Sequence, residues 1–389
     1  MNKIKVAHIL YSFEVGGIES LVLQFCNLMN KDEYEFHIIT LTNEDLQLAK
    51  LLPSQVKVHN LDLKKSEIKS IRGLFVGLNE LVKLFNIILP DIVHSHLTSL
   101  PLLFIATAMK FSRIKSKHMR TVHTAGLFYE NQYTLSNKIK LLSEKIAMKL
   151  VKTNVVGVSS TADENNRRLF VDVANDIKLI TNGVGLNKYD KEQYQNVKKE
   201  DFGVSEDSLL VSYVARLSYE KNHELLIDIW SDVIEKVPNA VLVIAGDGEL
   251  NSFLKEKVKD YKLENNIKFL GLINNVPELL SVTDIGVFPS SYEGFGLVLI
   301  ENFAMKIPVV ASDIKSFQNI AKDKRDAFLI PVEDKKMYVT KIVELCRDVK
   351  LRKEIGDNAY SVAQNYSIEK TVHEYDLYYK YSLKDSKNV

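Results

Sequence analysis

Short apolar runs alternate with amphipathic patterns along the whole chain. An apolar run of about four to eight residues between turn signals is typical of a buried strand, and apolar residues three and four positions apart indicate a helix. In the first half we expect strands at residues 5–10, 36–41, 56–61, 92–96, 120–123, 155–158 and 177–180. This alternation predicts α/β domains built on parallel sheets.

A second series of strands follows a polar stretch, residues 185–207, in which no periodicity is clear. We expect these strands at residues 209–214, 240–245, 267–270, 285–288, 309–311 and 328–330, with helices at 223–237, 250–261 and 276–282. A chain of 389 residues suits two cores better than one. The pattern therefore predicts one domain at 1–185, a second at 186–366, and an aromatic amphipathic helix within 367–389.

The composition is that of a soluble globular protein of the cytoplasm. Cys26 and Cys346 stand far apart and give neither metal nor disulfide spacing, which favours a reducing compartment. No apolar run approaches the ~18 residues of a membrane span. Residues 3–12 lack the small-residue cleavage site of a signal peptide and are expected to form a buried strand.

The net charge of +1 hides an asymmetry between the two halves. Residues 1–185 hold 23 Lys and Arg against 17 Asp and Glu, whereas the remainder holds 28 against 33. Cations concentrate at residues 110–120 and again in a helical pattern that combines lysines with apolar residues: Lys138, Lys140, Lys145, Lys149, Ile139, Leu142, Ile146 and Leu150. Such a helix can lie on an anionic membrane, or its apolar side can belong to the core while its cations face solvent.

The most specific chemistry lies in the stretch Pro289-Ser-Ser-Tyr-Glu-Gly-Phe-Gly-Leu-Val-Leu-Ile-Glu301. Gly294 and Gly296 allow the backbone to approach a ligand closely. The N–H groups at the start of the following helix favour an anion such as a diphosphate. Glu301 can accept two hydrogen bonds from a vicinal diol such as a ribose. These features together predict a nucleotide-sugar site; the alternative is an ordinary strand–loop–helix with two exposed acids.

This stretch, with Glu301-Asn-Phe-Ala-Met-Lys-Ile-Pro-Val-Val after it, resembles the Glu-x7-Glu signature of the retaining glycosyltransferases of family 4. The resemblance implies the GT-B fold: two Rossmann-like, doubly wound α/β domains facing a central cleft, with the donor mainly on the second. It also implies that the C-terminal helix crosses back to the first domain. Asn302 and Lys306 replace the usual Ala and Gly, which we interpret as packing variation.

Three further motifs carry the resemblance into both domains. Gly16-Gly17 follows the first strand, where a ligand can bind at a strand's carboxyl end; the alternative is a tight strand–helix turn. Arg216 and Lys221 follow a strand of the second half, and both cations can meet a diphosphate, although two cations are common on any surface. His123 ends a strand of the first half and matches a family histidine that faces the donor sugar across the cleft.

Two histidines and two glycines complete the candidate set. His94 and His96 suggest a metal site, but no third ligand stands nearby in the sequence, and either could instead line an acceptor cleft. Gly246 and Gly271 resemble positions beside the nucleotide base. The resemblance assigns His123, Arg216, Lys221 and Glu293 to catalysis. It assigns these residues to donor binding: Gly16, Gly17, Gly246, Gly271, Phe295, Gly296, Leu297 and Glu301.

The resemblance implies a hexosyl- or N-acetylhexosaminyltransferase. It would move sugar, with retention, from a nucleoside diphosphate, expected to be UDP, to a hydroxyl of a lipid-linked glycan in bacterial exopolysaccharide or capsule synthesis. The chain has no Asp-x-Asp pair, so we expect no metal; no cofactor or nucleic acid is expected either. The location implied is the cytoplasm or the inner face of the membrane. The rival hypothesis is a non-catalytic GT-B partner subunit, but such modules usually lose the Arg/Lys pair or a Glu, which this chain keeps.

Overall fold

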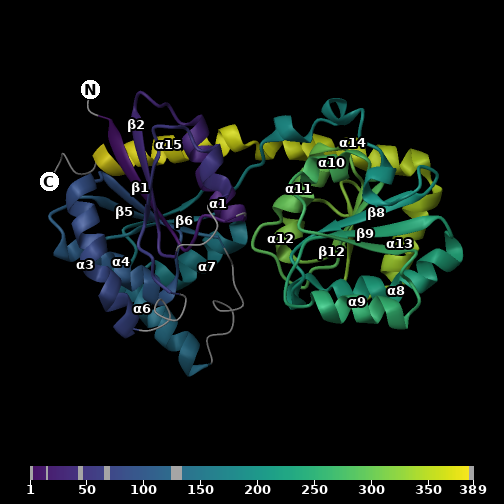
Figure 1. Cartoon of the computed structure of the whole chain (residues 1–389), viewed down its shortest axis with the longest axis horizontal. Coiled ribbons are helices and arrows are strands. Elements are labelled where there is room, and N and C mark those ends of the chain that lie inside the picture. The colour runs from purple at the N-terminus through teal and green to yellow at the C-terminus, as the bar shows by residue number, and fades with distance from the viewer. Residues whose placement is uncertain (1–2, 15, 43–46, 65–70, 124–133, 385–389) are drawn as a thin grey trace. The chain divides into compact units, whose positions relative to one another are not determined.

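The computed structural model describes residues 3–14, 16–42, 47–64, 71–123 and 134–384 (Figure 1). These residues form two compact units. The first contains the residues up to Asn182 together with those from Glu369 onward, and the second extends from Gly183 to Ile368. Among the described residues, no helix combines the length and the apolar character needed to cross a bilayer.

The first unit is built on a seven-stranded parallel sheet with the order β3-β2-β1-β4-β5-β6-β7. The strand order reverses between β1 and β4, which is the switch point of a doubly wound sheet. Its strands are β1 (Ile4–Leu10), β2 (Tyr34–Thr40), β3 (Lys57–Asn60), β4 (Ile92–Ser95), β5 (Lys117–Val122), β6 (Asn154–Gly157) and β7 (Asp176–Leu179). Its helices are α1 (Gly17–Leu28), η1 (Gln47–Leu51), α3 (Ile71–Ile88), α4 (Ser99–Phe111), α6 (Leu135–Val151), α7 (Ser160–Phe170) and α15 (Ile368–Lys384).

The second unit repeats this plan on a six-stranded parallel sheet with the order β10-β9-β8-β11-β12-β13. Its strands are β8 (Leu209–Val214), β9 (Ala240–Ala245), β10 (Ile267–Gly271), β11 (Ile285–Phe288), β12 (Val309–Ser312) and β13 (Phe328–Ile330). Its α-helices in the described residues are α8 (His223–Lys236), α9 (Asn251–Asp260), α10 (Val276–Ser281), α11 (Leu297–Ala304), α12 (Lys315–Gln318), α13 (Lys335–Arg347) and α14 (Val349–Ala363). Short 3₁₀ turns are η2 (Leu186–Tyr189), η3 (Lys191–Tyr194), η4 (Lys199–Phe202), η5 (Tyr219–Lys221) and η6 (Gln364–Tyr366).

The prediction of two Rossmann-like α/β domains is confirmed. The polar stretch at 185–207 folds into three 3₁₀ turns, η2 to η4, inside the second unit. Strand β5 begins at Lys117, earlier than the pattern predicts, because its polar side chains are buried with partners. Arg120, one of the cations of the basic first half, has no exposed surface and pairs with the equally buried Glu144 at 3.1 Å.

Helix α6 presents an apolar stripe to solvent. Its buried positions, Ser143, Ala147 and Met148 among them, lie on another face of the helix. The stripe consists of Leu135, Ile139, Leu142 and Ile146, with 75%, 55%, 59% and 47% of their surface exposed. The interpretation of Ile139, Leu142 and Ile146 as core is therefore wrong, although Leu150, expected to share their face, is half-buried.

Helix α15 packs on the face of the first sheet opposite the core that α3 and α4 form (Figure 1). Tyr379 Oη lies 2.6 Å from Nδ1 of His94 on β4, and Tyr375 Oη lies 2.9 Å from Oγ1 of Thr121 on β5. Tyr378 Oη donates to Asp176 at 2.9 Å. The last long helix is therefore part of the first unit's core rather than an appendage.

We expect Tyr379→Phe to lower the free energy of unfolding by about 1–3 kcal/mol, because a buried nitrogen of His94 loses its partner. Tyr381→Phe is the matched control: Tyr381 lies on the same helix but is 54% exposed, so its change should stay below about 0.5 kcal/mol. Urea denaturation followed by circular dichroism measures both. Equal losses in the two variants would contradict the role given to the buried hydroxyl.

Candidate functional site

Two loops of the second unit meet where its strand order reverses. Residues 215–222 follow β8, and residues 289–296 follow β11, the neighbouring strand. The backbone N–H of Ser291 donates to the carbonyl of Glu220 at 2.9 Å, and Asn222 Nδ2 donates to the carbonyl of Pro289 at 3.2 Å. In open α/β sheets this crevice outside the strand ends is where ligands bind.

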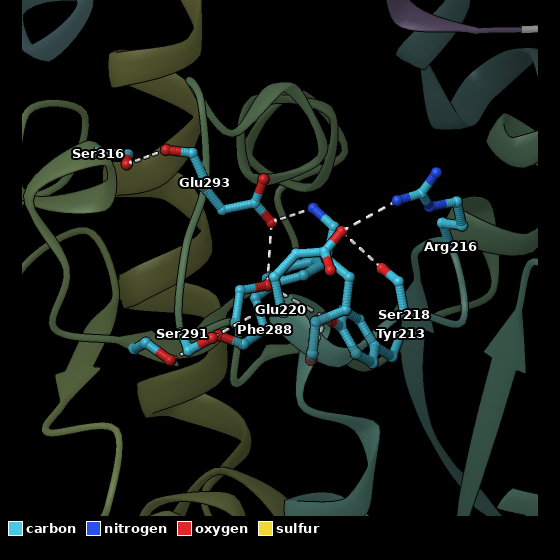
Figure 2. A network of polar contacts seen from close by, with 11 residues as sticks. Tyr213, Arg216, Ser218, Glu220, Phe288, Ser291, Glu293 and Ser316 are labelled. Carbon is cyan, nitrogen blue, oxygen red and sulfur yellow. Dashed lines mark hydrogen bonds and ion pairs between the residues drawn. The ribbon is translucent and has the colours of Figure 1, made fainter. Parts of the chain in front are cut away.

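The shortest contact between these loops is an ion pair. Lys221 Nζ lies 2.6 Å from Glu293 Oε1. Ser290 Oγ donates to the same carboxylate oxygen at 2.9 Å, and Ser316 Oγ donates to the Glu293 carbonyl at 2.6 Å (Figure 2). Glu293 is only 9% exposed, and these partners compensate the burial of its polar atoms. The structure thus brings together two residues that the sequence predicted to be catalytic.

Arg216 lies beside this pair but is held more loosely. Its Nη2 approaches Glu220 Oε1 at 3.3 Å, and Ser218 Oγ donates to the same oxygen at 2.6 Å (Figure 2). The Arg216 side chain is 67% exposed. A planar guanidinium that is this accessible can form bidentate hydrogen bonds with an incoming phosphate or carboxylate.

Helix α11 begins directly after the Glu293 loop. Gly296 caps it with a φ of 104°, and a side chain there would also clash with the Phe317 ring, so the turn requires glycine. Phe295 is buried and meets Tyr366 edge-on, with ring centroids 5.8 Å apart. The Phe295 side chain therefore packs the core, and what this loop can offer a ligand is the backbone N–H groups up to Leu297.

Glu301 lies on α11 in a half-buried position. Burial raises the pKa of its carboxyl group, and a hydrogen bond from Tyr189 on η2 partly offsets that rise. Tyr189 is a residue that sequence analysis missed, because it stands in the stretch without periodicity. Its hydroxyl orients Glu301, the residue predicted to bind a ribose.

Gly246 and Gly271 support the same edge of the sheet. Gly246 has a φ of 140°, and a side chain there would clash with the carbonyl of Ala215, at the start of the loop after β8. Its N–H donates to the Gly271 carbonyl at 2.8 Å. Gly271 has a φ of 67° with open space beside it. Gly246 is therefore needed by the fold itself, and contact of either glycine with a base stays a prediction.

The two departures from the family signature differ in kind. Asn302 is buried and donates to the Val298 carbonyl at 2.8 Å, so it packs within the unit. Lys306 has a φ of 56°, a left-handed conformation that favours glycine. The usual glycine at this position thus has a backbone reason, and the interpretation of Lys306 as packing variation is incomplete.

In the first unit, Gly16 and Gly17 begin α1 at the carboxyl end of β1. Gly16 is extended, with a φ of −161°, and of the described residues a side chain there would meet only the flexible end of Glu19. A methyl group added at Gly17 would meet none of the described residues within 4 Å apart from its chain neighbours and its own helix backbone. Neither backbone angle nor packing therefore requires these glycines, which leaves the approach of a ligand as an explanation.

Histidines from three strands or strand ends form a cluster beside this turn. The sequence suggested a metal site at His94 and His96 but offered no third ligand; His8, on the adjacent strand β1, supplies one. However, both ring nitrogens of His94 and of His96 already form hydrogen bonds, at 2.6–3.0 Å. The cluster is arranged as a hydrogen-bond network. His123, at the end of β5, is half-buried and belongs to it.

Comparison with known proteins agrees with this geometry. Residues 15–188 match the family model described as Glycosyltransferase Family 4, and residues 194–362 match Glycosyl transferases group 1. The UDP-Gal:alpha-D-GlcNAc-diphosphoundecaprenol alpha-1,3-galactosyltransferase of Escherichia coli is 26% identical over 388 residues, which are 97% of each chain. The capsular polysaccharide glycosyltransferase CapM of Staphylococcus aureus is 26% identical over 92% of this chain and 99% of its own.

Solved structures share the same architecture. HepE from Anabaena, crystallised with UDP and glucose, superposes with a TM-score of 0.79 at 19% identity, over 96% of this chain and 98% of its own. WaaG, a glycosyltransferase of lipopolysaccharide biosynthesis, gives 0.76 at 14% identity, over 95% and 98%. With a family 4 match in the first half and a group 1 match in the second, the chain belongs to the family 4 glycosyltransferases of GT-B fold.

Proposed function

We propose that this glycosyltransferase moves a hexosyl or N-acetylhexosaminyl residue from UDP to a hydroxyl of a lipid-linked glycan, with retention at the anomeric carbon. The observation that carries the proposal is the set of donor-directed groups in one unit: Lys221 paired with Glu293, Arg216 exposed beside them, and Glu301 on the helix that follows. The named substrate of the Escherichia coli relative, a GlcNAc-diphosphoundecaprenol, supports the class of acceptor.

The mechanism follows from the charges. An arriving diphosphate attracts Lys221 and Arg216, and the N-terminus of α11 adds favourable N–H groups. Lys221 then shares its charge between the diphosphate and Glu293, whose carboxylate becomes available to a sugar hydroxyl. As the bond from the anomeric carbon to the diphosphate breaks, these cations meet the growing negative charge, which is where electrostatic catalysis acts. The bond to the acceptor oxygen forms on the same face, and its proton passes to the leaving diphosphate.

The rival hypothesis of a non-catalytic partner subunit makes a different prediction for the free protein. Such a subunit has no need to bind a nucleotide sugar. Calorimetric titration with UDP-galactose, UDP-glucose and UDP-N-acetylglucosamine separates the two hypotheses. Binding of one donor followed by its slow hydrolysis supports the enzyme, whereas no heat with any of the three overturns it.

We expect Glu301→Gln to weaken UDP binding by about 1–3 kcal/mol, because an amide accepts fewer hydrogen bonds from the ribose diol. Burial raises the pKa of Glu301, so its ionised form is lost at a higher pH than for an ordinary glutamate. The advantage of wild type over the variant should therefore be full near neutrality and shrink as the pH falls through that raised pKa. Isothermal titration calorimetry with UDP at several pH values measures the ratio of the dissociation constants of the variant and the wild type.

Glu344→Gln is the matched control, a half-buried glutamate on helix α13 of the same unit. It should bind UDP as wild type does at every pH. If Glu301→Gln binds UDP with wild-type affinity at neutral pH, the assignment of the ribose to Glu301 is wrong.

Arg216→Ala and Lys221→Ala should each lower turnover by roughly a hundredfold, since each removes a charge placed to meet the leaving diphosphate. Lys236 is an exposed cation on α8, and Lys236→Ala should leave turnover unchanged. Because these cations replace a metal in the proposal, transfer should survive a chelator. If a chelator abolishes transfer and magnesium or manganese restores it, the metal-free mechanism is wrong.

We also propose that helix α6 rests on the anionic surface of a membrane, where a lipid-linked acceptor lies. Its stripe, Leu135, Ile139, Leu142 and Ile146, is exposed, and Lys138, Lys140 and Lys149 on the same helix are exposed as well. Apolar residues next to cations match the interface between acyl chains and acidic headgroups. Lys145, the fourth cation of the predicted set, is half-buried, 3.1 Å from Asp172, and is left out of the proposal.

Replacing Lys138, Lys140 and Lys149 by Gln should release the protein from vesicles of anionic lipid, and high salt should do the same, because charges are screened beyond about 10 Å at ~0.1 M salt. Co-sedimentation measures the bound fraction. The control replaces three exposed cations of the second unit, Lys255, Lys259 and Lys262, and should pellet like wild type. Equal pelleting of all three proteins with anionic vesicles would show that α6 is not the contact.

A further inference from the structure

Three histidine rings form a hydrogen-bonded line through the first unit. His8 Nδ1, on β1, lies 3.0 Å from His96 Nε2, and His96 Nδ1 lies 2.9 Å from Nε2 of His123. His8 and His96 are buried, whereas His123 is half-buried at the carboxyl edge of the sheet. The line therefore leads from the core to the edge at which the strand ends and the Gly16-Gly17 turn lie.

All three rings are neutral at physiological pH. Desolvation by burial lowers the pKa of His8 and of His123 to about 3, and it holds the pKa of His96 well below its usual value. A neutral imidazole carries one hydrogen, on either Nδ1 or Nε2. Each of the two contacts between rings needs one N–H donor. His96, in the middle, carries a single hydrogen, so it donates in one contact and accepts in the other. Both hydrogen bonds must therefore point in the same direction along the line.

The inner end of the line selects the direction. His8 Nε2 is buried and has no hydrogen-bond partner among the described residues, and its ring lies against Phe25 and Phe36, with centroids 5.5 and 5.8 Å away. If the hydrogens pointed inward, His8 would bury an N–H group with no acceptor. If they point outward, it buries only a bare lone pair, and unpaired acceptors are tolerated better than unpaired donors in protein cores.

We infer that His8 and His96 act as positioning residues that fix the tautomer of His123, so that His123 carries its hydrogen on Nδ1 and presents it as a donor at the edge of the sheet. This inference rests on the proposed function for the ligand, whose partner atom must then be an acceptor: a sugar hydroxyl oxygen or an oxygen of the diphosphate. His123 Nδ1 hydrogen-bonds to none of the described residues, so it is available.

This arrangement assigns His123 a definite role and excludes another. Its Nε2 lone pair is already engaged by the His96 N–H, so His123 has no free basic nitrogen with which to take a proton from the attacking hydroxyl. It binds and orients by donating a hydrogen bond. A His123 that donates a hydrogen bond and does not act as a base agrees with a reaction in which the leaving diphosphate accepts the proton of the acceptor hydroxyl.

The test is the tautomeric state of His123 in the free protein. ¹⁵N-histidine labelling and long-range ¹H–¹⁵N correlation distinguish a protonated ring nitrogen from a bare one, and the spectrum of His123→Gln assigns the signal. We expect the hydrogen on Nδ1. A hydrogen on Nε2 overturns the inference whether or not the protein transfers sugar, so this result is independent of the proposed function.

Two variants of His96 then separate positioning from packing. His96→Leu removes the donor to His123, so the hydrogen should move to Nε2, and hydrolysis of UDP-galactose, UDP-glucose or UDP-N-acetylglucosamine should fall roughly tenfold or more. His96→Asn places an amide N–H near the Nδ1 position and should restore both the tautomer and most of the rate. Equal losses in the two variants, with no change of tautomer, would overturn the positioning role.

His118→Leu is the matched control for stability. His118 is also buried in this sheet, where it hydrogen-bonds to Ser95 Oγ at 3.0 Å and Thr153 Oγ1 at 2.7 Å, but it is outside the line. Its loss should lower the melting temperature and leave the His123 tautomer on Nδ1. A shift of the tautomer in this variant too would mean that general loosening of the core, rather than His8 and His96, sets it.

Discussion

The constraint on which everything else depends is that both sheets are parallel throughout. Parallel strands bring all their carboxyl ends to one edge, and the reversal of strand order opens a crevice there. In the second unit this joins loops that are about seventy residues apart in the sequence, those of Lys221 and Glu293. In the first it places the turn at Gly17 near the ends of the strands that carry His96 and His123. The chemistry of each unit thus follows from its topology.

The pair of Lys221 and Glu293 shows how a protein can keep a lysine and a buried carboxylate at the edge of a sheet without destabilising itself. A buried carboxylate without partners would be costly, and so would an unpaired lysine. Here each compensates the other at 2.6 Å, and Ser290 supplies a further hydrogen bond. A ligand that takes over one partner would leave the other without its compensating charge, so the two residues are coupled through a single contact.

Sequence reasoning found the strands and the loops because apolar periodicity and glycines are local signals. It missed side chains whose importance depends on contacts across the fold. His8 reads as one polar position in an apolar strand, and only the pairing of β1 with β4 brings it beside His94 and His96. Tyr189 stands in a stretch without periodicity, yet it orients Glu301.

Burial could not be predicted from residue type alone. Arg120 counts as a surface cation in any composition, and its burial depends on Glu144 of a helix that follows it. Conversely, the apolar positions of α6 follow helical spacing, which does not reveal on which side the core lies. The roles predicted for the glycines also cannot be derived from periodicity, because they concern a ligand and not the chain.

The position of helix α15 in the first unit has a consequence for folding during translation. The second unit is one continuous segment, whereas the first needs residues from both ends of the chain. As translation proceeds, the first seven strands emerge early, but the tyrosines that cover His94 and Thr121 are made only after the whole second unit. The first unit is therefore completed only after the second unit has been made, and until then His94 and Thr121 lack their tyrosine partners.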